Sequence, residues 1–252
     1  MAHLKEVVEA LEEELRTKEI PDYPGAHNGL QLENRKGMVS RVACAVDASF
    51  PVIQKAVDSG ADLLLVHHGL FWQGVRSMTG PVFEKFRLAI ENDLAIYSSH
   101  IPLDIHPGLG NNILLSRALG LGDGSPFFDW KGIDLGRRST CDLTLGELVE
   151  KLQQVLKGAV TIRGELDQQV GQLGIITGGA GSEVESMAGL GIDTFLTGEG
   201  PHWSHPLAEE LGINVLYGGH YATETFGVRA LGHWLETRFE VSSVFLDHPT
   251  GL

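Results

Sequence analysis

The feature of this chain that most constrains its fold is the alternation of short apolar runs with amphipathic segments. Residues 62–66 read DLLLV, an apolar run typical of a strand buried on both faces of a parallel sheet. Residues 50–59 before it and 81–91 after it carry apolar side chains at helical spacing. Strands separated by helices in this way predict an α/β fold with mixed, largely parallel sheets.

The same pattern continues along the chain. We predict helices at 3–16, 50–59, 81–91, 109–119, 144–157, 182–190, 204–212 and 221–238, and strands at 39–47, 62–66, 94–98, 159–163, 170–177, 193–197, 213–217 and 243–246. Gly, Asp and Ser residues interrupt 120–140, which predicts a first unit at 1–125 and a second at 126–252. The C-terminal helix and strand can pack back on the first unit.

The two halves share a spacing that suggests a duplicated strand–helix topology. Asp47 to His67 spans 20 residues, and Thr177 to Thr197 also spans 20. Each interval runs from one strand end through a helix to the next strand end. Chance spacing in an ordinary α/β chain is the alternative.

Composition and net charge limit where the protein is expected to work and what it is expected to bind. The chain of 252 residues has 19 Lys plus Arg against 33 Asp plus Glu, a net charge of −14, which disfavours nucleic acid as the main ligand. No apolar run approaches the roughly 20 residues of a membrane span, and the acidic N-terminus resembles no targeting peptide, so we expect a cytoplasmic protein. Cys44 and Cys141 are too few for a disulfide framework and are expected to be small buried residues.

Histidine, the commonest metal ligand, is unevenly distributed. Seven of the 11 histidines lie within residues 67–106 and 202–220. Five of the seven belong to polar clusters that follow three predicted strands. The candidate ligands in these clusters are His67 and His68, His100 and Asp104, and His220 and Glu224. Each cluster alone has an ordinary structural explanation: strand-capping histidines, a turn histidine with a helix cap, or a salt bridge on a first helical turn.

The position of all three clusters at strand ends favours a metal site. Ligands of open α/β sheets bind beyond the carboxyl ends of the strands. Because neighbouring side chains of a strand point to opposite faces, His67 and His68 are expected to converge only where Gly69 breaks the strand. Imidazoles and carboxylates without thiolate suit iron, zinc, manganese or cobalt, and one bridging carboxylate would let the cluster hold two divalent ions.

Three segments, HHGLFW, SSHIPLDIHPGLGNN and GGHYATET, resemble in this order the hallmark segments of a known family. This is the NGG-one-interacting factor three family, whose bacterial members are described as GTP cyclohydrolase I type 2 homologs or dinuclear metal-centre proteins. The resemblance implies two intertwined α/β domains and a ring-like homohexamer with its metal sites facing an internal cavity. It also implies a dinuclear metal site whose ligands are His67, His68, Asp104, His220 and Glu224.

One segment departs from the family pattern, and several other residues invite a functional role. Ala26–Leu30 reads AHNGL and lacks the aspartate that the family has near this position. Glu199 is a candidate general base or ligand partner, with a solvated loop acid as the alternative. The turn at 178–181 could hold an anion but more simply makes a tight turn. His202 and His205 could line the same cavity or the surface.

These observations predict a dinuclear metal-dependent hydrolase that acts on a small molecule, nucleotide-like or GTP cyclohydrolase-like, with a metal-activated water. His100 or Glu199 would transfer protons, because neither is needed among the five ligands. The alternative is a non-catalytic metal-binding scaffold, metal carrier or regulatory interaction protein. An open coordination position beside a pocket would distinguish the enzyme from a closed storage site.

Overall fold

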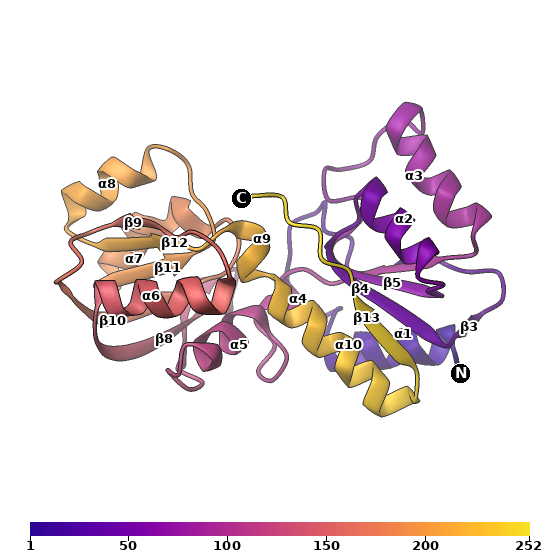
Figure 1. Cartoon of the computed structure of the whole chain (residues 1–252), viewed down its shortest axis with the longest axis horizontal. Helices are drawn as coiled ribbons and strands as arrows, with labels where there is room; N and C mark the ends of the chain where they lie inside the picture. The colour runs from indigo at the N-terminus through magenta and orange to yellow at the C-terminus, as the bar shows by residue number, and fades with distance from the viewer. The chain divides into compact units, whose positions relative to one another are not determined.

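A computed structural model describes residues 1–252 and has a mixed α/β architecture with largely parallel sheets (Figure 1). The chain divides into two compact units, residues 1–103 with 227–248 and residues 104–226 with 249–252. The chain thus leaves the first unit earlier than the expected boundary at residue 125, so that Asp104 belongs to the second unit. None of the helices combines the length and the apolar character that a membrane span needs.

A five-stranded sheet forms the centre of the first unit. Its order is β13-β4-β5-β6-β2, with bounds Ser242–Phe245, Arg41–Asp47, Leu63–His68, Ala95–Ser98 and Gly29–Leu32. The first four strands are parallel and β2 is antiparallel at the edge. A separate antiparallel pair joins β1 (Ala2–His3) to β3 (Met38–Val39). The C-terminal strand β13 thus completes the sheet of the first unit.

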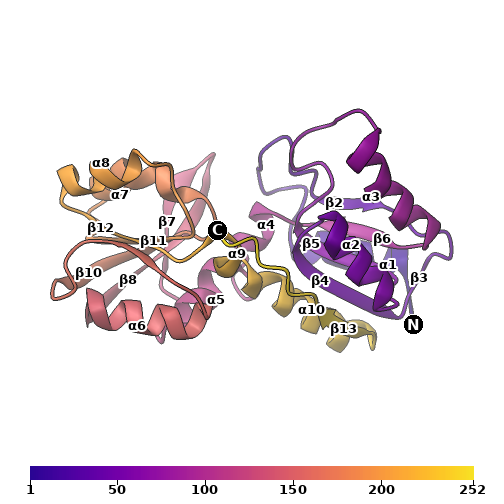
Figure 2. The same cartoon turned by 45° about the horizontal axis from the view of Figure 1, so that its top comes forward.

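Helices cover both faces of this sheet (Figures 1 and 2). On one face α2 (Phe50–Asp58) and α3 (Gly80–Glu91) pack on the apolar side chains of β4, β5 and β6. On the other face lie α1 (Leu4–Glu14) and α10 (Thr225–Phe239). A Cβ on Gly232 of α10 would lie 2.6 Å from the Cys44 sulfur, so glycine permits the close approach of this helix to β4.

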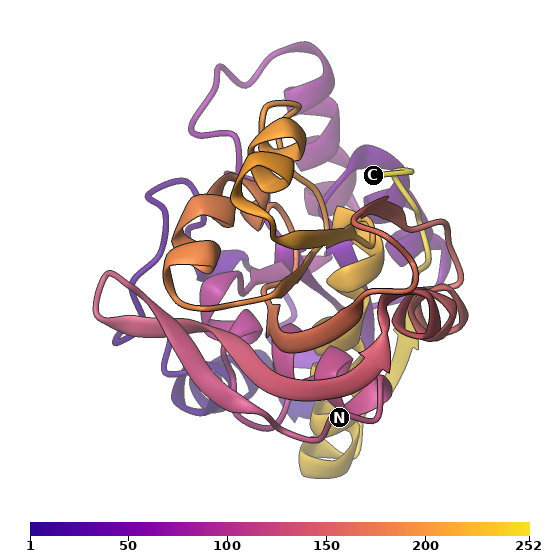
Figure 3. The same cartoon turned by 90° about the vertical axis from the view of Figure 1, so that its left-hand side faces the viewer.

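The second unit is built in the same way around a six-stranded sheet. Its order is β7-β8-β10-β11-β12-β9, with bounds Ser125–Trp130, Ile133–Thr144, Gln169–Ile175, Thr194–Thr197, Asn214–Tyr217 and Thr161–Arg163. Strands β10, β11 and β12 are parallel, and the remaining pairs are antiparallel. One face carries α5 (Asn111–Ala118) and α6 (Leu145–Leu156), and the other carries α7 (Val184–Gly189) and α8 (Ser204–Leu211) (Figures 1 and 3).

The duplicated topology predicted from the sequence is present. The first unit runs β4-α2-β5-α3-β6, and the second runs β10-α7-β11-α8-β12, a short 3₁₀ turn at Ala180–Glu183 preceding α7. An antiparallel strand lies beside the last parallel strand in each case, β2 beside β6 and β9 beside β12. Each unit therefore brings three parallel strand ends to one edge of its sheet, where ligands of such sheets bind.

The segment expected to separate the two units is instead a β-hairpin. Strands β7 and β8 pair antiparallel across Lys131 and Gly132, whose φ angles are +53° and +83°. Two consecutive positive φ values are the geometry of a tight hairpin turn, which glycine and polar residues favour. The glycines and aspartates of 120–140 were therefore turn signals of a hairpin, which the composition alone did not distinguish from a linker.

A buried carboxylate joins the loops at the opposite, N-terminal edge of the first sheet. Asp62, just before β5, accepts hydrogen bonds from the Ser40 amide and hydroxyl at 2.6 Å each and from the Arg41 amide at 3.0 Å. It also pairs with Lys36. Burial acts to raise the Asp62 pKa, but these partners together outweigh burial and lower the pKa below its usual value.

We predict that Asp62→Asn destabilises the fold by about 1.5–3 kcal/mol at pH 7, the range for hydrogen bonds to a charged group. Because the folded pKa lies below the unfolded value of about 3.9, this stabilisation is present above that pH and is lost as pH falls through the folded pKa. The difference between variant and wild type should therefore shrink at pH 3. Urea unfolding at pH 7 and pH 3 measures the difference in the free energy of unfolding, with Asp58→Asn as an exposed control. An equal difference at the two pH values would contradict the prediction.

Candidate metal centre

Three histidines gather at the carboxyl ends of β5 and β6 in the first unit. His67 and His68 end β5, and His100 follows β6; all three are buried. One ligand nitrogen from each ring lies within 4.8 Å of the others. The ring centroids of His67 are 4.8 Å from those of both His68 and His100. We call these three residues the histidine set.

The tandem histidines lie within the strand rather than beyond it. Backbone pairing continues to His68, which faces Asp47, so β5 runs two residues beyond the predicted strand at 62–66 and ends directly before Gly69, the residue expected to break it. At the end of a strand the side chains can lean along its direction, past the last pair of residues. The two rings therefore approach each other although their Cβ atoms leave opposite faces.

A hydrogen bond at Nδ1 orients each ring of the histidine set. His67 Nδ1 donates to the Ser99 carbonyl oxygen at 2.9 Å, and His68 Nδ1 lies 2.9 Å from an Asp47 carboxylate oxygen. His100 Nδ1 lies 2.8 Å from an Asp22 carboxylate oxygen. Acceptors at Nδ1 favour the tautomer whose Nε2 is the metal-binding nitrogen.

Asp22 is a partner of the histidine set that the sequence did not reveal. Besides His100 Nδ1, its carboxylate accepts from the Ile101 amide at 3.0 Å and from the Asn28 side chain at 2.7 Å. Burial acts to raise the Asp22 pKa, but the hydrogen bond and charge of His100 lead the contacts that lower it below its usual value. The segment Ala26–Leu30 has no carboxylate, but Asp22, four residues before it, supplies one to His100. Its loop, PDYPG, has no periodic pattern to reveal the pairing.

Aromatic side chains pack against the histidine set. The Trp72 ring stacks on His68 with centroids 4.9 Å apart and lies 4.3 Å from the His100 centroid. Tyr23 packs edge-on against Trp72 at 6.4 Å. The loop after Gly69 supplies this indole, so it limits the access of water to the imidazoles from one side.

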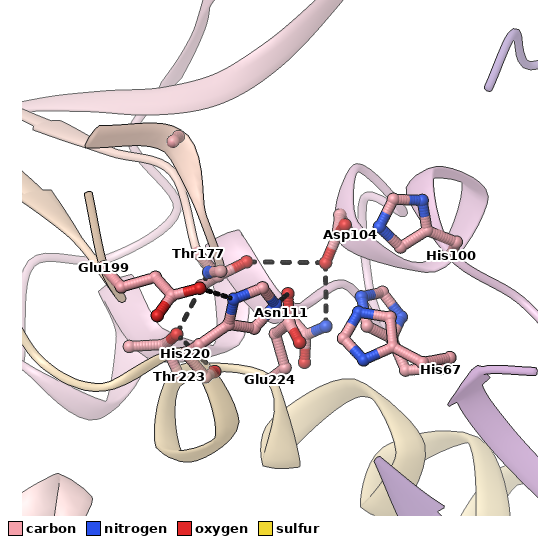
Figure 4. Close-up of polar contacts among 12 residues, drawn as sticks. His67, His100, Asp104, Asn111, Thr177, Glu199, His220, Thr223 and Glu224 are labelled. Carbon is pink, nitrogen blue, oxygen red and sulfur yellow. Dashed lines mark hydrogen bonds and ion pairs between the residues drawn. The ribbon is translucent and has the colours of Figure 1, made fainter. Parts of the chain in front are cut away.

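The second unit carries its own donors, which we call the carboxylate set: Asp104, His220 and Glu224. His220 begins the short helix α9 (His220–Thr223), and its Nε2 lies 3.2 Å from a Glu224 carboxylate oxygen, as their spacing of four residues predicted. Asp104 Oδ1 accepts from the Asn111 side chain at 2.8 Å and from the Thr177 hydroxyl at 3.4 Å (Figure 4). These two donors fix the orientation of the Asp104 carboxylate.

Glu199 orients His220 from the other side of the ring. Its carboxylate lies 2.9 Å from His220 Nδ1 (Figure 4). Burial lowers the His220 pKa, but Glu224 and then Glu199 outweigh it and raise the pKa to about 9. His220 therefore carries a proton at neutral pH when no metal is bound, and a cation that takes Nε2 must displace that proton.

Glycines make room for the carboxylate set. Gly178, three residues after the end of β10, has φ +72°, and a Cβ there would clash with the Glu224 carboxylate. The amides of this turn bond within the protein, Gly178 to the Thr223 hydroxyl at 3.1 Å and Gly181 to the Glu199 carbonyl oxygen at 3.0 Å. The turn at 178–181 is therefore a support for the ligands rather than an anion-binding loop.

The two other histidines considered with the site lie apart from both sets of donors. His205 Nδ1 accepts a hydrogen bond from Arg163 at 3.1 Å, and its ring stacks on Tyr217 at 4.6 Å. This is a packing contact between α8 and the edge of the sheet. His202 is exposed in the turn before α8.

The chemistry of the donors fits a divalent metal. Oriented imidazole nitrogens in one unit, and an imidazole with two carboxylates in the other, are ligands for iron, zinc, manganese or cobalt. Thiolate plays no part, because burial raises the pKa of Cys44 to about 12 and Cys141 is buried among apolar side chains.

The fold and these donors define a class: a protein of two α/β units whose parallel strand ends carry histidine and carboxylate side chains that could hold a metal ion. The model of the Duf34/NIF3 (NGG1p interacting factor 3) family matches residues 2–250, and the chain belongs to this family. The resemblance seen in the three sequence segments is thereby confirmed.

Relatives match over the whole chain. A GTP cyclohydrolase 1 type 2 homolog of Deinococcus radiodurans is 41% identical over 249 residues, covering 98% of this chain and 94% of the relative. One of Pyrococcus abyssi is 35% identical over 258 residues, covering 98% and 99%. Among solved structures, protein ybgI, described as of unknown function, has a TM-score of 0.90 at 32% identity, covering 100% of both chains. Reduced HcgD from Methanocaldococcus jannaschii has a TM-score of 0.85 at 28% identity, covering 98% of both.

We predict that metal binding at His68 quenches the fluorescence of Trp72, because a paramagnetic ion bound there lies within a few ångströms of the stacked indole. Titration of the metal-free protein with Co²⁺ should lower the tryptophan emission, and Trp72→Phe should remove most of the decrease. Trp234→Phe is the matched control and should retain it. Equal quenching in wild type and Trp72→Phe would show that Co²⁺ binds away from His68.

Proposed function

We propose that this protein is a dinuclear metal-dependent hydrolase whose metal ligands are His67, His68, Asp104, His220 and Glu224. The observation that carries the proposal is the way these side chains are held. Each of these histidines has an acceptor at Nδ1, which favours Nε2 as the nitrogen that binds a metal ion. Asp104 is oriented by two donors. Such support is the usual surrounding of metal ligands in proteins.

The charges support two ions rather than one. Asp104 and Glu224 are the anionic donors among the five ligands, so one shared carboxylate can offset part of the charge of two divalent cations. Iron, zinc, manganese and cobalt all suit this donor set. A pair of such ions supplies Lewis-acid activation of water and of the bond to be hydrolysed.

Two residues outside the ligand set are proposed to move protons. His100 is held by Asp22 and its ring contacts His67, so it can exchange a proton beside the ligands. The Glu199 side chain is 42% exposed while it bonds to His220, which lets it pass a proton between this site and solvent.

The substrate is proposed to be a small molecule, with GTP-like nucleotides as the first compounds to test. The relatives carry the name GTP cyclohydrolase 1 type 2 homolog, which is the reason for this choice. A chain of net charge −14 repels polyanions, so a nucleotide would need local positive charge, such as that of the metal ions, to bind its phosphates. A homohexamer, implied by the family resemblance, and the cytoplasmic location expected from the sequence are part of the same proposal.

Turnover is tested with metal-loaded protein against GTP, other nucleotides, phosphoesters and cyclic amides. We expect Glu224→Gln to lower the rate on the best substrate at least 100-fold, because the variant loses an anionic ligand. Glu150→Gln, an exposed change on α6, is the control and should keep the rate. Full metal loading with no turnover on any compound would favour a metal carrier or scaffold instead.

We predict different metal stoichiometries for carboxylate and histidine variants. Asp104→Ala and Glu224→Ala should each lose at least one ion, because two cations would then face mainly neutral imidazoles. His67→Ala and His68→Ala remove a neutral donor that water can partly replace, so they should weaken binding without emptying the site. Elemental analysis at equal metal supply measures this, with the exposed His233→Ala as control. Carboxylate variants that keep two ions while histidine variants lose them would rule out a bridging carboxylate.

A further inference from the structure

A lysine lies at the carboxyl end of β4, close to the histidine set. Lys85 of α3 reaches across to donate from Nζ to the Ala48 carbonyl oxygen at 3.1 Å. Ala48 follows Asp47, which orients His68, and the Ala48 amide donates to the His68 carbonyl oxygen at 2.9 Å. The ammonium group is therefore one residue away from the carboxylate that holds a proposed metal ligand.

No carboxylate balances this ammonium group. Its pKa is lowered, first by burial and then by the positive charge of Arg76, and both influences disfavour the charged form. Lys36, by contrast, pairs with the Asp62 carboxylate. The chain has 33 acidic residues, yet half-buried Lys85 faces a carbonyl oxygen and a second cation. It therefore lacks the carboxylate partner that a buried charge usually requires.

The second cation comes from the loop that covers the histidines. Arg76 belongs to residues 69–79, the same loop whose Trp72 stacks on His68. Arg76 is close enough to Lys85 for its charge to lower the Lys85 pKa, so two positive side chains lie near each other in a protein whose net charge is −14. Two neighbouring cations without a paired carboxylate favour the binding of an anion.

We propose that Lys85, assisted by Arg76, binds the phosphate group of a small-molecule ligand beside the histidine set. Lysine has three N–H donors, and the Ala48 carbonyl oxygen engages one, so the others can donate to phosphate oxygens. Phosphate is preferred over carboxylate because its greater negative charge matches two cations. The proposal rests on the proposed function in one respect, since this phosphate would belong to the substrate of the metal centre.

The test measures the binding of inorganic phosphate by calorimetry, with the metal content of every sample determined in parallel. Lys85→Met should keep its metals and bind phosphate at least ten-fold more weakly than wild type. Lys55→Met is the matched control, because Lys55 also donates to a backbone carbonyl oxygen, that of Asp247 at 2.8 Å, but is exposed. This control should keep the wild-type affinity. Arg76→Gln, an exposed loop change, should weaken binding at least three-fold and serves if Lys85→Met does not fold.

Unchanged phosphate affinity in Lys85→Met, or in Arg76→Gln where the lysine variant does not fold, would overturn the proposal. Acetate that binds as tightly as phosphate, with the same dependence on Lys85, would overturn the choice of phosphate. A chain that binds no metal would defeat the proposed function alone, because the Lys85-dependent binding of phosphate can still be measured in that protein.

Discussion

The hydrogen bond at Nδ1 of each candidate ligand histidine is the interaction on which the candidate metal centre depends. An imidazole without it can rotate and can present either nitrogen, so its Nε2 has no fixed direction. The acceptors are backbone or side-chain oxygens at neighbouring strand ends: Ser99 for His67, Asp47 for His68 and Glu199 for His220. The parallel register of each sheet thus positions acceptor and ligand together, and the helices on both faces keep that register.

The charged side chains of both units also bear on the candidate metal centre. Acidic side chains hold the imidazoles of both units, and the pKa of His220 rises to about 9 because Glu224 and Glu199 surround it. A bound cation replaces the proton that this pair of carboxylates attracts. Lys85 lies beside the histidine set without an acid, which is unusual for a half-buried lysine and is the basis for assigning it an anionic ligand. The opposite edge of the first sheet uses a buried acid, Asp62, for stability instead.

Local patterns in the sequence predicted most of the helices and strands, because hydrophobic periodicity depends only on neighbouring residues. The helix start at His220 and the buried strand before His67 are examples. The hairpin at 125–144 was missed because its turn residues look like those of a linker, and the tandem histidines were expected beyond their strand rather than in it. Both errors concern geometry that neighbouring strands impose.

The sequence by itself determined the α/β class, the duplicated strand–helix order and the residue types available to bind metal, since periodicity and composition are local properties. Only the tertiary structure decided which distant groups meet. Asp22 and His100 are 78 residues apart in the chain, yet their side chains form a hydrogen bond. The last strand returns to pair with β4, and Asp104 belongs with the second unit. Such pairings follow from chain topology and packing, which bring together residues whose sequence neighbours give no sign of the partner.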